Sequence, residues 1–334
     1  MSVMGRLLSG SAPLRGRASL ELIVQPFGYR DAARFWGADD PRLAALLHSV
    51  VGGTPAYRRE FVAYDAPDGP RDFDAWVRRT VLSPQSPLFR EARYLLAEQT
   101  EIRDPALYHS VLGAIAAGNH TNGGIANFTG RRSADLTHPL NLLEDCALVA
   151  REPDVFRNGR WTYRVTEPLV NFYEAVMRPE WSRLEAGQAD AVWRDRRADF
   201  LRRVAGPHFE TLCRLFAQTA SPDLFGGPPG EVGSGVVKDP ANRTQIEIDV
   251  AVFAPAEHGR PRRVLSLGEA KWGEVMTSRH VQRLARARDL LSPAFDTTSC
   301  VLACYGAAGF SDDLRAAADP RLAMVSLADI YAAA

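Results

Sequence analysis

The stretch QIEIDVAVFAPAEHGRPRRVLSLGEAKW at residues 245–272 decides the fold, because it reads as two strands joined by a turn. Aliphatic and acidic residues alternate through 245–253, which predicts an aliphatic face and an acidic face. The aliphatic residues are Ile246, Ile248, Val250 and Val252, and the acidic ones are Glu247 and Asp249. The second strand, 264–272, is expected to carry Glu269 and Lys271 on one face. Residues 257–261, EHGRP, have the composition of a turn between the strands.

Asp249, Glu269 and Lys271 are therefore expected to converge on one side of a two-stranded ribbon. Carboxylates a few ångströms apart repel, and a hard divalent cation such as Mg²⁺ or Mn²⁺ relieves the repulsion. Such an ion lowers the pKa of a bound water and neutralises charge on a scissile phosphate, while a neighbouring ammonium group orients the water. Glu210, in a helix predicted over about 202–217, would complete the acidic cluster. The alternative interpretation is an ion-pair network on the surface of a sheet.

Composition limits the classes of function. The formal net charge is +0, so any binding of nucleic acid must come from local basic patches. The four cysteines are scattered, which favours small core residues in a reducing cytoplasm over a zinc site. No apolar stretch approaches the ~20 residues needed to span a bilayer, so we expect a cytoplasmic protein without a membrane partner.

Residues 101–170 carry the signals of a winged helix-turn-helix. Three helices and two strand-like runs are expected, at 107–117, 121–128, 133–146, 148–151 and 161–165. Thr121 and Ser133 are expected to cap the second and third helices. Asn158-Gly159, between the two strand-like runs, is a strong hairpin signal.

A winged helix usually places its third helix in the major groove of DNA and its wing beside the DNA backbone. Arg131 and Arg132 stand at the start of the predicted third helix, and Arg157 and Arg160 lie in the predicted wing. These four arginines are the candidate DNA-binding residues, because guanidinium groups pair with phosphates. The alternative is that the winged region packs against a neighbouring part of the protein.

The remaining segments are interpreted from spacing and composition. Residues 1–25 include a strand-like run without a neighbouring strand, which predicts a remnant of a larger sheet. Residues 26–100 are predicted to be helical and to resemble a lid, and residues 171–202 to form a helical linker. Strands and helices alternate through 203–334. The predicted fold class is multidomain α/β.

The last region resembles the PD-(D/E)XK nuclease superfamily. Asp249 fits the acidic residue of the first strand, Glu269-Ala270-Lys271 fits the E-x-K element, and Glu210 fits the acid of the preceding helix. The resemblance implies a restriction-endonuclease-like α/β domain and phosphodiester hydrolysis that depends on Mg²⁺ or Mn²⁺. It also implies that Asp249 and Glu269 are metal ligands and that Lys271 assists the attacking water.

Nearly the whole chain resembles the prokaryotic, archaeal-type AAA ATPases that carry a C-terminal DUF234 domain. The matching stretches are SGSAPLRGR at 9–17, QPF at 25–27 and GGTPAY at 52–57, followed by the winged helix and the E-x-K region. The resemblance implies that 1–25 is the remnant of an ATPase core and that 203–334 is the DUF234 domain.

The sequence departs from that family in two ways. No G-x-x-x-x-G-K-[ST] motif occurs, so we expect the chain not to bind ATP alone. The run Gly233-Ser234-Gly235 stands where family members often have tryptophans. Two functions follow as expectations: a DNA-binding protein with a Mg²⁺-dependent nuclease-type domain, or a non-catalytic DNA-binding or regulatory part that works with a separate P-loop ATPase chain.

Overall fold

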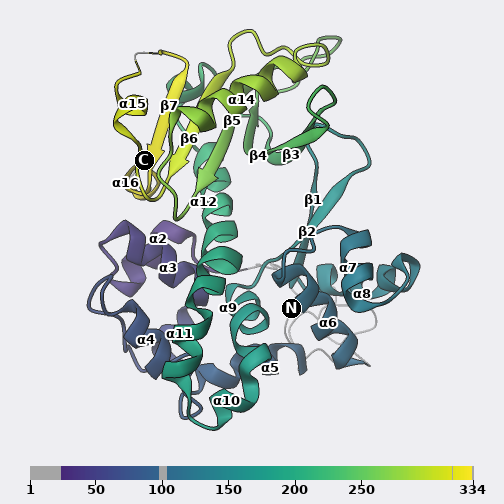
Figure 1. Ribbon diagram of the computed structural model, residues 1–334. Helices are drawn as coiled ribbons and strands as arrows, with labels where there is room; N and C mark the ends of the chain where they lie inside the picture. Colours follow the sequence, from purple (N-terminus) through teal and green to yellow (C-terminus); the bar gives the residue numbers. More distant parts are fainter. Residues whose placement is uncertain (1–23, 98–103, 318, 333–334) are drawn as a thin grey trace, which may run out of the picture.

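The computed structural model describes residues 24–97, 104–317 and 319–332. The segment predicted as an ATPase remnant, 1–25, lies almost entirely outside these residues. Figure 1 shows a mixed α/β molecule in which a sheet with its helices lies at the top, a helical part at the lower left, and a smaller part with a hairpin at the lower right.

The helical part follows the apolar spacing of the sequence. It contains α2 (Tyr29–Trp36), α3 (Pro41–Val51), the π-helical turn η1 (Tyr57–Phe61), α4 (Phe73–Arg79) and α5 (Leu88–Ala97). Asp40 fixes the start of α3, because its carboxylate accepts hydrogen bonds from the N–H groups of Arg42 and Leu43, each at 2.9 Å. The residues whose spacing predicted this helix are buried, namely Leu43, Leu46, Leu47 and Val50.

The smaller part has the predicted order of elements. These are α6 (Pro105–Ala116), α7 (Asn122–Thr129), the 3₁₀ turn η2 (Ser133–Leu136), α8 (Thr137–Asp145), and the antiparallel strands β1 (Val149–Pro153) and β2 (Trp161–Val165). Thr121 caps α7 as expected, since its hydroxyl accepts from the N–H of Gly124 at 3.1 Å. The cap predicted at Ser133 is wrong: Ser133 is the first residue of the 3₁₀ turn, and Arg132 occupies the N-cap position.

A long helical rod joins the helical part to the sheet. Shorter helical segments precede it: α9 (Pro168–Phe172), η3 (Tyr173–Met177), η4 (Arg178–Glu180) and α10 (Trp181–Glu185). The rod itself consists of α11 (Ala189–Phe200), the π-helical turn η5 (Leu201–Ala205) and α12 (Gly206–Gln218), which run end to end in Figure 1. The boundary predicted at residue 203 therefore falls inside a continuous helical segment.

Five strands form the sheet in the order β3-β4-β5-β6-β7. They are β3 (Val232–Asp239), β4 (Thr244–Phe253), β5 (Val264–Lys271), β6 (Val301–Gly306) and β7 (Leu322–Ser326). Strand β4 is antiparallel to both of its neighbours, β3 and β5, whereas β5, β6 and β7 are parallel. Helix α12 packs on one face and α14 (Ser278–Leu291) on the other. The short helices α13 (Pro222–Phe225), α15 (Asp312–Arg315) and α16 (Leu327–Tyr331) lie in or after the connections.

The four aliphatic residues of β4 that were predicted on one face are divided between two faces. Ile246 and Ile248 belong to the core under α14, and Val250 and Val252 to the core under α12. The cause is a bulge: Gly233 of β3 pairs with Ala251, whereas Gly235 pairs with Ile248, so β4 holds one extra residue there. An extra residue reverses the alternation of side chains that follows it.

The tip of the β1–β2 hairpin packs on the edge strand β3. We call Asp154, Val155 and Phe156 the wing tip. The N–H of Val155 donates to the Ser234 carbonyl at 3.1 Å, and the ring of Phe156 lies 6.0 Å from that of Phe253. The smaller part is therefore fastened to the sheet through its hairpin.

Two glycines of β3 make room for the wing tip. A Cβ on Gly233 would lie 2.5 Å from Cγ1 of Val155, and a Cβ on Gly235 would lie 2.6 Å from the ring of Phe156. Real Cβ atoms do not approach so closely, so these positions require glycine or a displaced wing tip. Glycine at these two positions of β3 thus has a packing reason.

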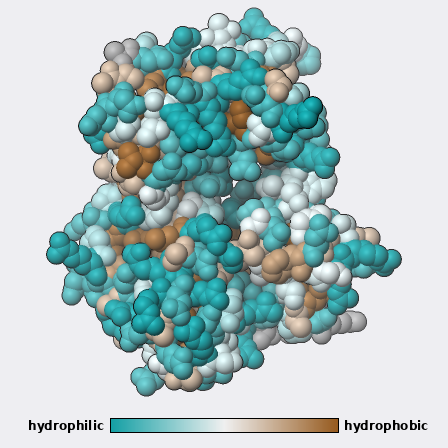
Figure 2. Space-filling view, in the orientation of Figure 1, coloured by the Kyte–Doolittle hydropathy of each residue, from teal (hydrophilic) through white to brown (hydrophobic). Residues whose placement is uncertain are grey.

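The buried cysteines Cys213, Cys300 and Cys304 pack in the core, as expected for small apolar residues. Within the residues that the structure describes, we find no helix with both the length and the apolar character needed to cross a membrane. Figure 2 shows that the face turned toward the reader is hollowed at its centre, between the upper part and the two lower parts.

Candidate active site

The predicted site residues lie where β4 and β5 separate. The ladder between these strands ends at the pair Val250 and Gly268. Beyond it, the Asp249 side chain replaces a backbone acceptor, because its Oδ2 accepts from the N–H of Ala270 at 2.9 Å. The Asp249 carboxylate is thereby fixed beside residues 269–271.

Lys271 lies between two carboxylates. Its Nζ is 2.9 Å from Oε1 of Glu269 and 3.9 Å from Oδ2 of Asp249. Arg283 of α14 also contacts Glu269, with Nη1 at 3.1 Å from Oε1. The Glu269 side chain is 1% exposed and that of Lys271 is 30% exposed. The structure therefore brings Asp249, Glu269 and Lys271 together, with the ammonium group on the more open side.

The second carboxylate oxygen of Glu269, Oε2, is buried and has no hydrogen-bond partner within the described residues. A buried acceptor without a partner destabilises a protein, because the water that it lost is not replaced. Such an unsatisfied oxygen, next to a second carboxylate, is suited to bind a cation.

Glu210 approaches the same place from α12. Burial, together with the charge of Asp249, raises the pKa of Glu210 to about 8. Arg214, one turn further along α12, donates from Nη1 to the main-chain carbonyl of Asp249 at 3.1 Å. Its Nη2 lies 3.8 Å from Oε2 of Glu152 on β1. Glu210 therefore interacts electrostatically with the predicted cluster, and Arg214 connects the cluster to the β1–β2 hairpin.

The charges of the site influence one another. Burial raises the pKa of Asp249, against the opposing effect of Lys271. For Lys271, burial lowers the pKa, but Asp249, Glu269 and Glu210 outweigh it and the pKa is raised. Lys271 is therefore an ammonium ion at neutral pH, and carboxyl groups outnumber it.

The number of carboxylates at this site bears on whether it could hold a metal ion. Within the described ranges, no group of three or more His, Cys, Asp or Glu side chains lies close enough together to hold one. Mg²⁺, however, commonly uses only one or two carboxylates and keeps several water ligands. Asp249, with its raised pKa, and Glu269, with its unpartnered Oε2, are the two groups that would hold such an ion.

Two residues of this site were missed in the sequence. Arg214 stands four residues after Glu210, so helical spacing could have placed the two side chains on one face. Arg283 had no local signal, because its contact with Glu269 depends on how α14 crosses the sheet. Both arginines contact the predicted cluster directly.

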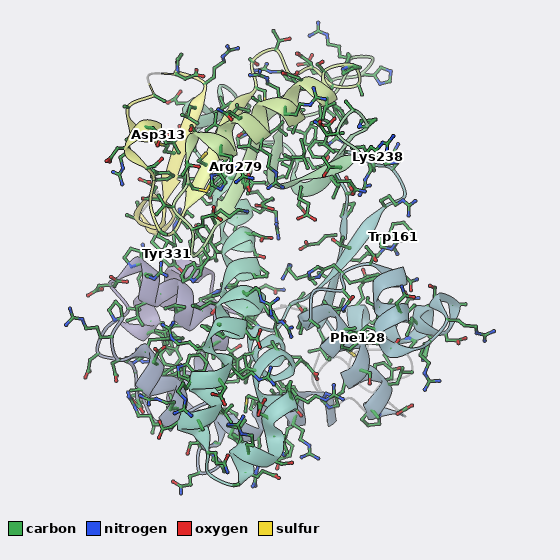
Figure 3. All side chains as sticks on the ribbon, in the orientation of Figure 1. Phe128, Trp161, Lys238, Arg279, Asp313 and Tyr331 are labelled. Atoms are coloured by element: carbon green, nitrogen blue, oxygen red, sulfur yellow. The ribbon has the colours of Figure 1, made fainter. Side chains whose placement is uncertain are left out.

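The four candidate DNA-binding arginines lie on the smaller part. Arg131 and Arg132 are exposed between α7 and η2, and Arg132 pairs with Asp135 at 2.9 Å. Arg157 pairs with Asp154 of the wing tip at 2.6 Å, and Arg160 is exposed. Figure 3 labels the large side chains Phe128 and Trp161 on the same part, and both are exposed.

Comparison with known proteins gives one distant relative. An uncharacterized protein of Methanocaldococcus jannaschii is 25% identical over 220 residues, which are 65% of this chain and 47% of that protein. The chain thus spans about half the length of the curated relative that it matches. No protein-family model matches the chain, and no solved structure matches it.

Proposed function

We propose that the chain is a DNA-binding protein that hydrolyses phosphodiester bonds with the help of Mg²⁺ or Mn²⁺. Asp249 and Glu269 would hold the ion, which when bound supplies charge neutralisation at the phosphate and a water of lowered pKa. Lys271 would donate a hydrogen bond that orients the attacking water. Glu210, with its pKa near 8, holds or releases a proton at the edge of the site.

The position of Lys271 is the observation that carries this proposal. The sequence contains two lysines, Lys238 and Lys271, among 40 basic residues. In a chain whose basic residues are almost all arginines, a lysine stands between the two carboxylates. A compact ammonium group has rotatable donors and a pKa that responds to its surroundings, whereas a guanidinium group is a wide, rigid fork. The arrangement therefore suits orientation of a water more than a structural ion pair.

DNA binding would come from the smaller part, which we propose is a winged helix. Arg131 and Arg132 precede its third helix, and Arg157 and Arg160 lie in the connection between β1 and β2. Support for this assignment comes from the three helices and hairpin in the expected order. Because these contacts would involve phosphates, we expect DNA affinity to fall steeply with salt.

Plasmid cleavage tests the proposal. Supercoiled plasmid is incubated with the protein and Mg²⁺ or Mn²⁺, in parallel with Lys271→Ala, Lys271→Arg and the matched control Lys238→Arg. We expect cutting by the wild type and by Lys238→Arg, and a loss of about 100-fold or more in both Lys271 variants. Equal cutting by Lys271→Ala would refute catalysis at this site.

A second candidate is a non-catalytic DNA-binding or regulatory part that works with a separate P-loop ATPase chain. The fastening of the wing tip to β3 favours it, because a hairpin that packs on the sheet has less surface left for a DNA backbone. The same assay separates the two candidates. DNA that is bound but uncut in both metals supports the second.

A further inference from the structure

A cavity of about 490 Å³ lies where the helical part, the smaller part and the rod meet. Its walls come from α3, the end of α6, the link from β2 to α9, and the segment from η5 into α12. This volume is within the range of small-molecule sites in proteins. The carboxylates and the lysine of the candidate active site are not among its lining residues.

Basic groups dominate the polar lining. Three arginines, Arg164, Arg202 and Arg203, border the cavity, and Glu167 is the one acidic residue among the described lining residues. Arg164 pairs with Glu152 through Nε at 2.7 Å, and Arg202 pairs with Asp199 through Nη2 at 2.6 Å. Each of these contacts uses one edge of a guanidinium group that has five N–H donors. Among the described lining residues, cationic side chains therefore outnumber anionic ones.

Of the three arginines that border the cavity, Arg203 has the longest contact with a carboxylate. Its Nε is buried and has no hydrogen-bond partner in the described part of the chain. This nitrogen lies 3.8 Å from Oδ1 of Asp199 on α11, which is beyond hydrogen-bond distance. Asp199 also pairs with Arg196 and Arg202, so one carboxylate faces three guanidinium groups and positive charge remains beside the cavity.

The other titratable groups of the lining add little negative charge. Nδ1 of His48 lies 2.9 Å from Nε2 of His208, and burial lowers the pKa of His48 to about 4. Burial raises the pKa of Glu167 to about 7, helped by the charge of Glu91. Glu167 is therefore largely protonated below neutral pH and opposes an anion only weakly. Apolar side chains, among them Phe27, Ile115 and Leu212, provide the remaining wall.

We propose that this cavity binds a compact organic dianion, a phosphate ester or a dicarboxylate, through the guanidinium groups of Arg164, Arg202 and Arg203. Planar guanidinium groups match the paired oxygens of both kinds of ligand. The apolar wall would accept a short carbon skeleton. The proposed site shares no residue with the candidate active site.

Isothermal titration calorimetry on the full chain tests this proposal. The probes are inorganic phosphate, glycerol 3-phosphate and succinate, with glycerol as the uncharged control. We expect binding of one molecule per chain by at least one dianion and none by glycerol. Tighter binding of glycerol 3-phosphate supports a phosphate ester, and tighter binding of succinate supports a dicarboxylate.

Three variants locate the binding. Arg203→Gln and Arg202→Gln are expected to weaken it about tenfold or more, which is the usual effect of losing one charge-assisted hydrogen bond. Arg194→Gln is the matched control: it lies on α11 of the same rod, is 76% exposed at its side chain, and does not line the cavity. Because Arg202 is 68% exposed, its variant keeps the test valid if Arg203→Gln fails to fold. Failure of every dianion to bind, or wild-type affinity in both cavity variants, would overturn the proposal.

Discussion

The candidate active site and the cavity surround a buried carboxyl group with different partners. On the sheet side, Glu269 is 1% exposed but contacts Lys271 and Arg283. On the cavity side, Glu167 receives a hydrogen bond from the Tyr57 hydroxyl at 3.4 Å, and its pKa is raised to about 7. The difference teaches that two buried carboxyl groups of one chain can have different partners: two cations at Glu269, and a tyrosine hydroxyl at Glu167.

The two environments are also connected. Arg214 binds the carbonyl of Asp249 and lies 3.8 Å from Glu152, and Glu152 in turn pairs with Arg164 at 2.7 Å. Arg164 lines the cavity. A continuous row of charged side chains thus runs from the candidate active site, across the hairpin, to the cavity.

The largest expected effect comes from removing the charge of the paired carboxylate. Glu269→Gln places an amide beside Lys271 and Arg283 and leaves both cations without their common partner. Breaking a buried ion pair from one side typically destabilises a protein by about 3 kcal/mol. Urea unfolding at pH 7 measures it, with the exposed Glu185→Gln as control. A change below about 1 kcal/mol would mean that Glu269 is not held by these cations.

An intermediate effect is expected at the hairpin that connects the two environments. Gly235→Ala would drive a methyl group against the ring of Phe156, which must then leave its place beside Phe253. Overpacking of this kind costs about 2 kcal/mol. Gly273→Ala is the matched control, because nothing lies within 4 Å of its Cβ position. Thermal unfolding compares the two, and equal melting temperatures would show that the wing tip is not docked in solution.

The smallest effect is expected at Glu167 and depends on pH. The raised pKa means that the folded state holds this proton more tightly than the unfolded chain does. Its contribution to stability is therefore present below about pH 4.5 and is lost as pH rises through about 7. Glu167→Gln should be close to the wild type at pH 5 and more stable than the wild type at pH 8. Unfolding curves at both pH values measure the difference, and a variant that is less stable at pH 8 contradicts the assignment.

The sequence was informative where structure depends on neighbours along the chain. The alternation in 245–253 and the E-x-K spacing placed Asp249, Glu269 and Lys271 on adjacent strands, and helical spacing placed Glu210 on the preceding helix. Capping by Thr121 was predictable for the same reason, because the acceptor and the donor are three residues apart.

What could not be predicted depends on segments far apart in the chain. The prediction that Val250 and Val252 share a face with Ile246 and Ile248 was wrong. The bulge in β4 that separates them is seen only in the pairing of β4 with β3. The packing of Val155 on β3 could not be predicted, because it depends on Gly233, and the sequence of the hairpin does not indicate where Gly233 lies. The cavity assembles His48, Arg164 and Arg203 from three segments, so no local pattern marks it.

The rarity of lysine has a practical consequence for chemical labelling. An amine-selective reagent finds two side-chain targets in the whole sequence. Lys238 is exposed on β3, at the right of Figure 3, whereas Lys271 is held as an ammonium ion between carboxylates. Acylation requires the neutral amine, so Lys238 should react first. The ratio of the two modified peptides in mass spectrometry then reports whether Lys271 is still held between its carboxylates. Lys238 serves as the internal reference, so no substitution in the protein is needed.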